Sequence, residues 1–256
     1  MKSLIIGDLH SQFYKVREGI EQILKEEKIE HIIFLGDYVD KRGFYDSEDK
    51  ELEEKLLKDL NDLVFWKRNL KIKSTFLCGN HDYAYISNNM FPTTKTKEEI
   101  SKAVESLLLQ LNLKASVLVN NFLCSHAGIN QQWWNKFIGK RVDISSKADD
   151  YLNFIFDSYL ENRKMLHPNP FELVSKYRGG FDQFSSPFWC DIKELMVDFV
   201  PECKQIVGHT PVLSCINILE GTGNELYACD TFSELGDYSV LILDAQNVTV
   251  KKLNRV

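Results

Sequence analysis

The chain has 256 residues, of which 44% are hydrophobic and 27% charged, and its 37 acidic and 31 basic residues give a net charge of −6. This composition is ordinary for a globular protein and excludes disordered, collagen-like and low-complexity classes. The mild acidity argues against bulk binding to nucleic acid or to an anionic membrane. No run approaches the ~20 apolar residues of a membrane span, and Asp8 comes too early for a signal peptide.

The six cysteines are scattered, with no Cys-x-x-Cys pair, and four of them lie in apolar runs typical of strands. This usage favours reduced thiols in the core of a cytoplasmic protein over a disulfide framework. No linker, repeat or low-complexity tract divides the chain, so we predict a single domain over residues 1–256. Within it, residues from about 130 to 200 are expected to form a cap over the site.

The first third alternates compact apolar runs with amphipathic ones. Ser3–Gly7, His31–Leu35 and Ser74–Cys78 are typical of buried strands, whereas apolar residues recur at helical spacing over 16–24 and 52–64. Strand and helix in this alternation predict right-handed crossovers and parallel strands in one sheet.

The remainder of the chain has a different pattern. A helix is expected over 100–111 and a hairpin from Ser116–Val119 and Phe122–Ser125, followed by an aromatic-rich and mostly helical segment over 130–200. Further strands are expected at Gln205–Gly208, Cys215–Leu219, Leu226–Cys229, Tyr238–Leu243 and Val248–Leu253. The fold class is therefore α/β, with two stacked sheets covered by helices.

The residues that follow the strands carry the chemistry. Five strand ends read Gly7-Asp8-Leu9-His10, Gly36-Asp37-Tyr38-Val39-Asp40, Gly79-Asn80-His81-Asp82, Ser125-His126-Ala127-Gly128 and Gly208-His209-Thr210. Ligands bind at the carboxyl edge of an open α/β sheet, so we expect these side chains to meet there. At four of the ends a glycine precedes the polar residue and permits a sharp turn or a close backbone approach.

This donor set suits two divalent cations. Carboxylate, amide and imidazole ligands together favour Mn, Fe or Zn over a thiolate zinc site. We expect Asp8, His10 and Asp37 to hold one ion. The second ion would be held by Asp37, Asn80, His126 and His209. A shared carboxylate keeps two ions ~3.5–4 Å apart, as hydrolysis at a two-metal site requires.

Each residue taken alone has a simpler explanation. Asp37 and Asn80 are common turn formers, and His126 or His209 alone would more often be a hydrogen-bonded core histidine. These explanations do not account for all five motifs in order, each after an apolar run.

The ordered motifs resemble the signature of the calcineurin-like metallophosphoesterases. Gly36–Gly43 and Ser125–Ile129 are similar to the phosphoprotein phosphatase (serine/threonine phosphatase-like) branch, and the likeness runs from residue 7 to about 231. The resemblance implies an αββα sandwich of two mixed sheets flanked by helices, with the metal site at the carboxyl edges of the strands. It also implies two metal ions per chain, with manganese expected first and Fe or Zn as alternatives.

The chain departs from this branch at three places. Lys41 separates Asp40 from Arg42, Cys78 replaces an arginine before Gly79-Asn80-His81-Asp82, and Phe232 replaces a glycine after Asp230-Thr231. The metal ligands are retained but the residues that read the substrate are not standard, which leaves the substrate class open.

The resemblance gives His81 the role of proton donor to the leaving oxygen, after attack by a metal-bridging hydroxide. We expect Asp40 to hydrogen-bond the far nitrogen of His81, although a capping carboxylate is the alternative. Arg42 and Arg178 are the candidate phosphate-binding residues, because a guanidinium donates two hydrogen bonds to a phosphate, although either could be a surface charge. Trp133, Trp134, Phe188 and Trp189 would pack the cap or form a stacking platform.

Three functions are compatible with these features. The first is a phosphoesterase that hydrolyses phosphate monoesters of a phosphoprotein or of a small phosphorylated compound. The second is a hydrolase of dinucleoside polyphosphates such as diadenosine tetraphosphate. The third is an inactive scaffold, which the retention of His81 beside six ligands opposes. The oligomeric state has no signal in the sequence.

Overall fold

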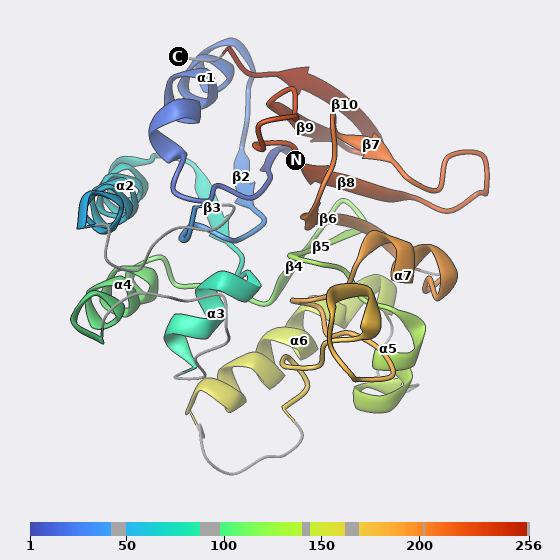
Figure 1. The fold of residues 1–256 in the computed structure, drawn as a ribbon. Coiled ribbons are helices and arrows are strands. Elements are labelled where there is room, and N and C mark those ends of the chain that lie inside the picture. Colours follow the sequence, from blue (N-terminus) through green and yellow to red (C-terminus); the bar gives the residue numbers. More distant parts are fainter. Residues whose placement is uncertain (42–49, 88–97, 140–143, 162–168, 202, 255–256) are drawn as a thin grey trace.

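The computed structural model describes residues 1–41, 50–87, 98–139, 144–161, 169–201 and 203–254, and its core is a pair of five-stranded sheets (Figure 1). In order across the first sheet, the strands are β10 (Asn247–Lys252), β9 (Ser239–Asp244), β1 (Lys2–Ile6), β2 (His31–Phe34) and β3 (Lys73–Phe76). The second sheet has the order β4 (Ser116–Val119), β5 (Phe122–Ser125), β6 (Lys204–Pro211), β8 (Leu226–Asp230) and β7 (Ile216–Asn217).

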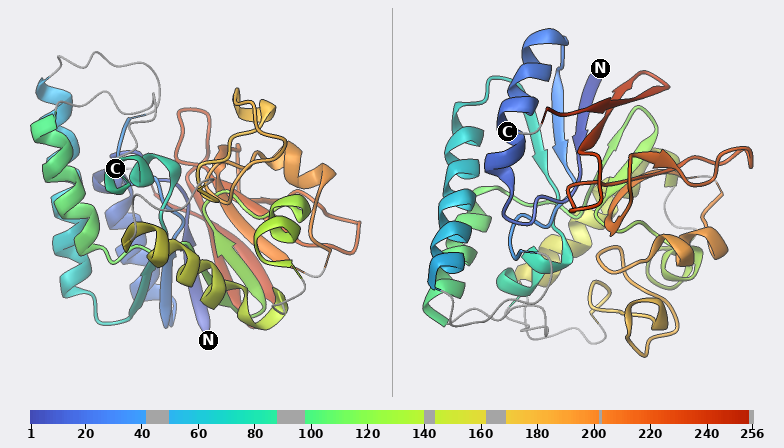
Figure 2. Two further views of the ribbon diagram at one scale, coloured as in Figure 1. Left: turned by 90° about the horizontal axis from the view of Figure 1, so that it is seen from below. Right: turned by 45° about the horizontal axis from the view of Figure 1, so that its top comes forward.

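Helices lie on the outer sides of the two sheets, as the left view of Figure 2 shows. On one side are α1 (Phe13–Glu26), α2 (Lys50–Asn69), α3 (Asn80–Ile86) and α4 (Glu98–Gln110). On the other are α5 (Gln131–Phe137), α6 (Ile144–Glu161) and α7 (Ile192–Val197), with the short 3₁₀ turn η2 at Lys176–Arg178. The predicted sandwich of two mixed sheets flanked by helices is therefore confirmed.

The apolar strand runs are continuous because both faces of the first sheet are buried. In β1, Leu4 and Ile6 pack in the cluster beneath the helices, whereas Ile5 points into the cluster between the sheets. In β2, Phe34 and Ile33 divide in the same way. Successive side chains of a strand point to opposite faces of the sheet, and here both faces are buried. Consecutive residues of these strands are therefore apolar, and the sequence shows an unbroken apolar run.

Strand directions bring the carboxyl ends of both sheets to one edge. β1, β2 and β3 are mutually parallel, and so are β5, β6 and β8. Both sheets are mixed. In the first, β9 runs antiparallel to β1 and β10 runs antiparallel to β9. In the second, β4 runs antiparallel to β5 and β7 runs antiparallel to β8.

The segment over 130–200 is less helical than expected. Between η2 and α7, and from 169 to η2, the described chain forms turns and loops around a buried aromatic cluster. In that cluster Phe171 stacks on Phe188 with ring centroids 4.8 Å apart, and Tyr83 of α3 lies 5.2 Å from Phe188. Aromatic packing, and not helix periodicity, therefore organises this part of the chain.

All six cysteines are buried and unpaired, as the sequence predicted. Among the described helices, none is both long enough and apolar enough to cross a membrane.

Candidate metal centre

The six predicted ligands converge at the shared carboxyl edge of the sheets. Asp8 and His10 follow β1, Asp37 follows β2, Asn80 opens α3 after β3, and His126 follows β5. These five residues are buried, and none has more than 4% of its surface exposed. His209 joins them from inside a strand.

The position of His209 corrects one expectation. The sequence predicted that the strand would end at Gly208, but β6 continues to Pro211 and its pairing with β8 shifts register between Val207 and Pro211. His209 lies in this bulge with φ of 61°. Because a bulge re-aims side chains, the imidazole points to the site although the strand continues.

The first group of donors surrounds a point between β1 and β2. His10 Nε2 lies 3.9 Å from Asp8 Oδ2 and 3.6 Å from Asp37 Oδ2. Two atoms that are each about 2.1 Å from a common ion can be at most about 4.2 Å apart. Both separations are within that limit.

The second group of donors also includes Asp37. His126 Nε2 is 3.5 Å from Asp37 Oδ2, 3.0 Å from Asn80 Oδ1 and 3.1 Å from His209 Nδ1. Asp37 therefore belongs to both groups. Its carboxylate lies within 4.8 Å of ligand atoms of His10 and His81 and also within 4.8 Å of ligand atoms of His126 and His209.

Backbone carbonyls fix the tautomers of two histidines. His10 Nδ1 lies 2.8 Å from the carbonyl oxygen of Asp40, and His126 Nδ1 lies 2.9 Å from that of Leu35. A carbonyl only accepts, so each Nδ1 carries the proton and each Nε2 presents a lone pair. Those lone pairs face the carboxylate of Asp37, an arrangement of acceptors that a cation satisfies.

The pKa values of Asp37, His126 and His209 favour the protonation states that bind a metal. Burial alone would raise the pKa of Asp37, but the charges of His126, His81 and His10 outweigh it and hold that pKa well below the usual range. Burial lowers the pKa of His126, and burial together with Arg178 lowers that of His209. Ionised carboxylate and neutral imidazole are the forms that bind a metal.

The backbone is strained where these side chains meet. His10, Asp37, Asp40 and His209 all have positive φ, between 44° and 61°. Such conformations cost free energy in non-glycine residues and cluster at functional sites.

Two of the glycines are needed for a close approach between strand ends. A Cβ on Gly79 would lie 2.1 Å from Asp37 Oδ1, and a Cβ on Gly208 would lie 2.1 Å from Asp8 Oδ1. These glycines therefore let the strand ends close on the carboxylates.

His81 lies beside the two groups of donors, and a hydrogen bond to Asp40 fixes its ring. Its Nδ1 is 3.0 Å from Asp40 Oδ2, and the hydroxyl of Tyr85 donates to Asp40 Oδ1 at 2.7 Å. Burial lowers the pKa of His81, but the charge of Asp37 and the hydrogen bond that His81 donates to Asp40 outweigh it and raise that pKa to about 9. Its side chain keeps 21% exposure, so the imidazolium reaches the solvent side of the site.

Asp82 and Tyr85 were missed at the sequence level. Asp82 accepts from the backbone N–H groups of Asp37, Tyr38 and Gly79, at 2.7 to 2.9 Å. It therefore ties the loop after β2 to the start of α3. Its position directly after Gly79-Asn80-His81 was the available signal, whereas nothing marked Tyr85.

The two predicted arginines have different outcomes. Arg42 lies outside the described residues. Arg178 approaches the site from η2, where its Nη2 donates to Thr210 Oγ1 at 2.6 Å and its Nε lies 3.0 Å from Asp191 Oδ2. It also reaches the carbonyl of His209, at 3.4 Å.

Three of the four aromatic candidates serve packing. Trp133, Trp134 and Phe188 are almost fully buried. Trp189 alone lies close to a predicted ligand, with its ring 6.0 Å from that of His209.

Comparisons with known proteins identify the family and agree with the fold. The model of a family described as calcineurin-like phosphoesterase matches residues 1–213. A protein-tyrosine phosphatase of a psychrophilic Shewanella species has a similar fold, with 18% identity and a TM-score of 0.51, over 99% of this chain and 80% of its own. A Saccharomyces cerevisiae serine/threonine phosphatase gives 17% identity and a TM-score of 0.51, over 100% and 80%. No curated protein matches.

Proposed function

Because this chain belongs to the calcineurin-like phosphoesterase family, we propose that it hydrolyses phosphate monoesters at a centre of two divalent cations. Family membership establishes a metal-dependent hydrolase of phosphate esters. The number of ions, their identity and the roles of individual residues are our proposals.

One observation carries the proposal. The proton-free Nε2 atoms of His10 and His126 face the same carboxylate oxygen, Asp37 Oδ2, at 3.6 and 3.5 Å. We assign Asp8, His10 and Asp37 to one cation. We assign Asp37, Asn80, His126 and His209 to the other, and manganese fits this mixture of oxygen and imidazole donors.

Bound cations would supply an activated water as nucleophile and neutralise charge on the phosphoryl oxygens. The leaving oxygen needs a proton from the protein, and we assign its donation to His81. Asp40 holds the imidazolium by its Nδ1 and Tyr85 holds Asp40, so the Nε2 proton is presented in a fixed direction. We assign Arg178 to orienting the phosphoryl group, although in the free protein its guanidinium also bonds Thr210.

The experiment begins with the purified protein, its metal content and its rate on an aryl phosphate. We expect close to two Mn, Fe or Zn ions per chain after reconstitution, and a rate that falls on chelation and returns when metal is added. Less than one ion per chain without activation by added metal would refute the proposal. Such a result would favour an inactive scaffold.

The substrate class needs a separate comparison. A phosphoserine peptide, an aryl phosphate and diadenosine tetraphosphate are compared by kcat/KM at saturating metal. Preference for either monoester supports our proposal, and preference for diadenosine tetraphosphate would replace it with phosphoanhydride hydrolysis at the same centre.

A further inference from the structure

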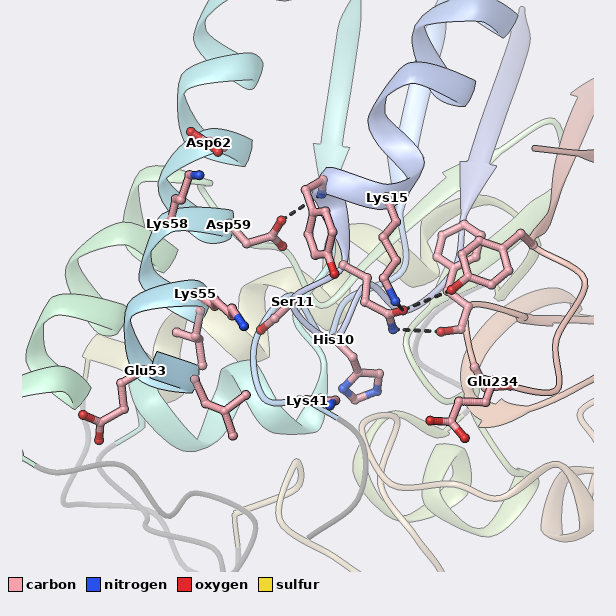
Figure 3. Close-up of a pocket in the computed structure, with 17 residues that line it drawn as sticks. His10, Ser11, Lys15, Lys41, Glu53, Lys55, Lys58, Asp59, Asp62 and Glu234 are labelled. Carbon is pink, nitrogen blue, oxygen red and sulfur yellow. Dashed lines mark hydrogen bonds between the residues drawn. The ribbon is translucent and has the colours of Figure 1, made fainter. Parts of the chain in front are cut away.

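A cavity of about 540 Å³ opens beside the candidate metal centre (Figure 3). It lies between the turn that precedes α1, the first half of α2 and the segment that follows β8. His10 lines it, so the cavity shares a wall with the metal centre. Its volume is in the range of about 300–1,000 Å³ that small-molecule sites occupy.

Three ammonium groups come to this cavity from separate elements. Lys15 is on α1, Lys55 is on α2, and Lys41 follows the loop that carries Asp37 and Asp40. Figure 3 shows all three side chains extending toward the space around His10 and Ser11. Lys55 Nζ also lies 2.6 Å from Glu51 Oε1, and Lys15 Nζ donates to Gln12 Oε1 at 3.1 Å. The Lys55–Glu51 pair is exposed, and such pairs contribute little to stability. A lysine on a flexible stem can therefore turn from such a partner toward an anion.

Four carboxylates line the cavity together with four lysines, and three of these carboxylates are occupied or point away from His10. Asp59 is occupied, because its oxygens accept from the backbone N–H groups of Phe13 and Tyr14 at 2.9 and 2.8 Å. In Figure 3 the carboxylates of Glu53 and Asp62 point away from His10, and Asp62 lies next to Lys58 at the far end. Glu234 is the remaining acidic residue and is exposed on the opposite rim.

The remaining walls are preformed. The amide of Gln12 donates to the carbonyl of Phe232 at 2.9 Å and accepts from the hydroxyl of Tyr238 at 3.1 Å. Leu52 and Leu56 of α2 add an apolar surface on the other side. A fixed polar floor with one apolar wall suits the compact body of a small organic molecule.

We propose that this cavity binds a second phosphoryl group, so that the substrate is a small compound with two phosphate groups. One phosphoryl group would be hydrolysed at the metal centre while the lysines hold the other. This inference rests on the proposed function and makes it more specific. A phosphate suits the site because its dianion offers three acceptor oxygens to three ammonium groups.

The test compares two inhibitors that differ by one phosphate. A hexose 1,6-bisphosphate and the matching hexose 6-phosphate compete with an aryl phosphate at saturating Mn²⁺, and Ki is measured for the wild type and for Lys15→Gln/Lys55→Gln. We expect the bisphosphate to bind the wild type about tenfold or more tightly than the monophosphate. In the double variant the Ki of the bisphosphate should rise about tenfold, and that of the monophosphate should change less than twofold.

The matched control is Lys25→Gln, which removes an exposed lysine from α1 away from the cavity. It should leave both Ki values unchanged. Equal Ki values for the two inhibitors in the wild type, or a bisphosphate Ki that the double variant does not alter, would overturn the proposal. The KM of a phosphoserine peptide is measured for the wild type and for the double variant. If the double variant raises this KM as much as it raises the Ki of the bisphosphate, the small-compound assignment is overturned.

The failure of the proposed function would be visible separately. If the metal-loaded wild type does not hydrolyse the aryl phosphate, the proposed function fails. Calorimetric titration of the bisphosphate into the metal-loaded proteins then tests the cavity alone. Weaker binding to the double variant than to Lys25→Gln supports the cavity, and equal binding refutes it.

Discussion

Asp37 is the residue on which both groups of donors depend. One of its oxygens lies within 3.6 Å of the Nε2 atoms of His10 and His126. Its other oxygen accepts from the backbone N–H of His81 at 3.0 Å, which fixes the carboxylate plane. A change at this residue therefore acts on both proposed ions, whereas a change at Asp8 acts on one.

Replacing Asp37 with Asn should remove both ions. The amide keeps the size but loses the negative charge that attracts two cations, so bound metal should fall from about two ions to below one per chain. Metal analysis after gel filtration measures this, and we expect at least a thousandfold loss of kcat, the scale of losing several kcal/mol of charge stabilisation. Asp8→Asn is the comparison, and it should retain one ion. Full metal content in Asp37→Asn would contradict the shared-ligand assignment.

Replacing His81 tests the proposed proton donor, because His81 is not among the six ligands that we assign to the ions. His81→Asn should keep the fold and the ions but lower kcat by about a hundredfold or more, because general acid catalysis contributes on that scale. The loss should grow with the pKa of the leaving alcohol, since poor leaving groups need the proton most. A series of aryl and alkyl phosphates measures this dependence. The same fractional loss for every leaving group would show that His81 acts by packing alone.

Residue types were the part of the site that the sequence could predict. Asp8, His10, Asp37, Asn80 and His126 lie close together, because each follows an apolar strand and parallel strands end at one edge. The supporting contacts were not predictable in the same way. The hydrogen bond from Tyr85 to Asp40 joins residues 45 positions apart, and no local pattern encodes it.

At the scale of elements, the loop between α6 and α7 depends on one buried carboxylate. Glu194 of α7 accepts from the backbone N–H and the hydroxyl of Ser185, at 2.6 and 2.8 Å. It also accepts from Ser175 Oγ at 2.7 Å and from the amide of Asn130 at 3.0 Å. Ser175 is the N-cap of η2, which carries Arg178, so this network positions the arginine.

Glu194→Ala should therefore destabilise the protein and weaken phosphate binding together. Four donors lose their acceptor, and we expect the free energy of unfolding to fall by about 2–4 kcal/mol in urea titrations. KM for an aryl phosphate should rise more than kcat falls. Lys193→Ala, an exposed change on the same helix, is the control and should alter neither quantity. A stable variant with unchanged KM would show that the network does not support Arg178.

Elements were predicted well where they carry an apolar period and poorly where they do not. The strands and α1, α2 and α4 have such a period. By contrast, α3 begins at Asn80 inside a polar motif, and its first turn is stabilised by Asp82 and Gly79 and not by an apolar stripe. The aromatic-rich segment over 130–200 was expected to be mostly helical, but over 169–191 only the short turn η2 is helical, and the aromatic side chains pack without helical periodicity.

At the scale of the whole molecule, strand order was the feature that could not be predicted. β9 and β10 come last in the sequence yet extend the first sheet beside β1, with Ile5 opposite Leu241. The two partners are more than 200 residues apart, and either sheet could have accepted an apolar strand. Burial between the sheets decides the pairing, because Leu241 and Leu243 complete the cluster that contains Ile5.

Stability of the whole molecule should depend on His31. This residue lies in β2, fully buried, with Nε2 2.9 Å from Thr75 Oγ1. Burial, assisted by the charge of Lys73, lowers the pKa of His31 to about 4. The folded protein therefore keeps His31 neutral, while the unfolded chain binds a proton at about pH 6.5. Between these two values the unfolded state binds more protons, so stability is complete above pH 6.5 and is lost as the pH falls toward 4.

Replacing His31 with Gln isolates this contribution, because the amide can still reach Thr75 but does not titrate. From pH 7 to pH 5 the wild type should lose about 1–2 kcal/mol more unfolding free energy than His31→Gln, as urea titrations at each pH would measure. Subtracting the change in unfolding free energy of His31→Gln from that of the wild type removes the contribution of carboxylates that titrate in the same pH range. Asp59 is one of them, because burial raises its pKa to about 6, and its effect on stability has the opposite sign. Parallel curves for the two proteins would mean that His31 is protonated in the folded state.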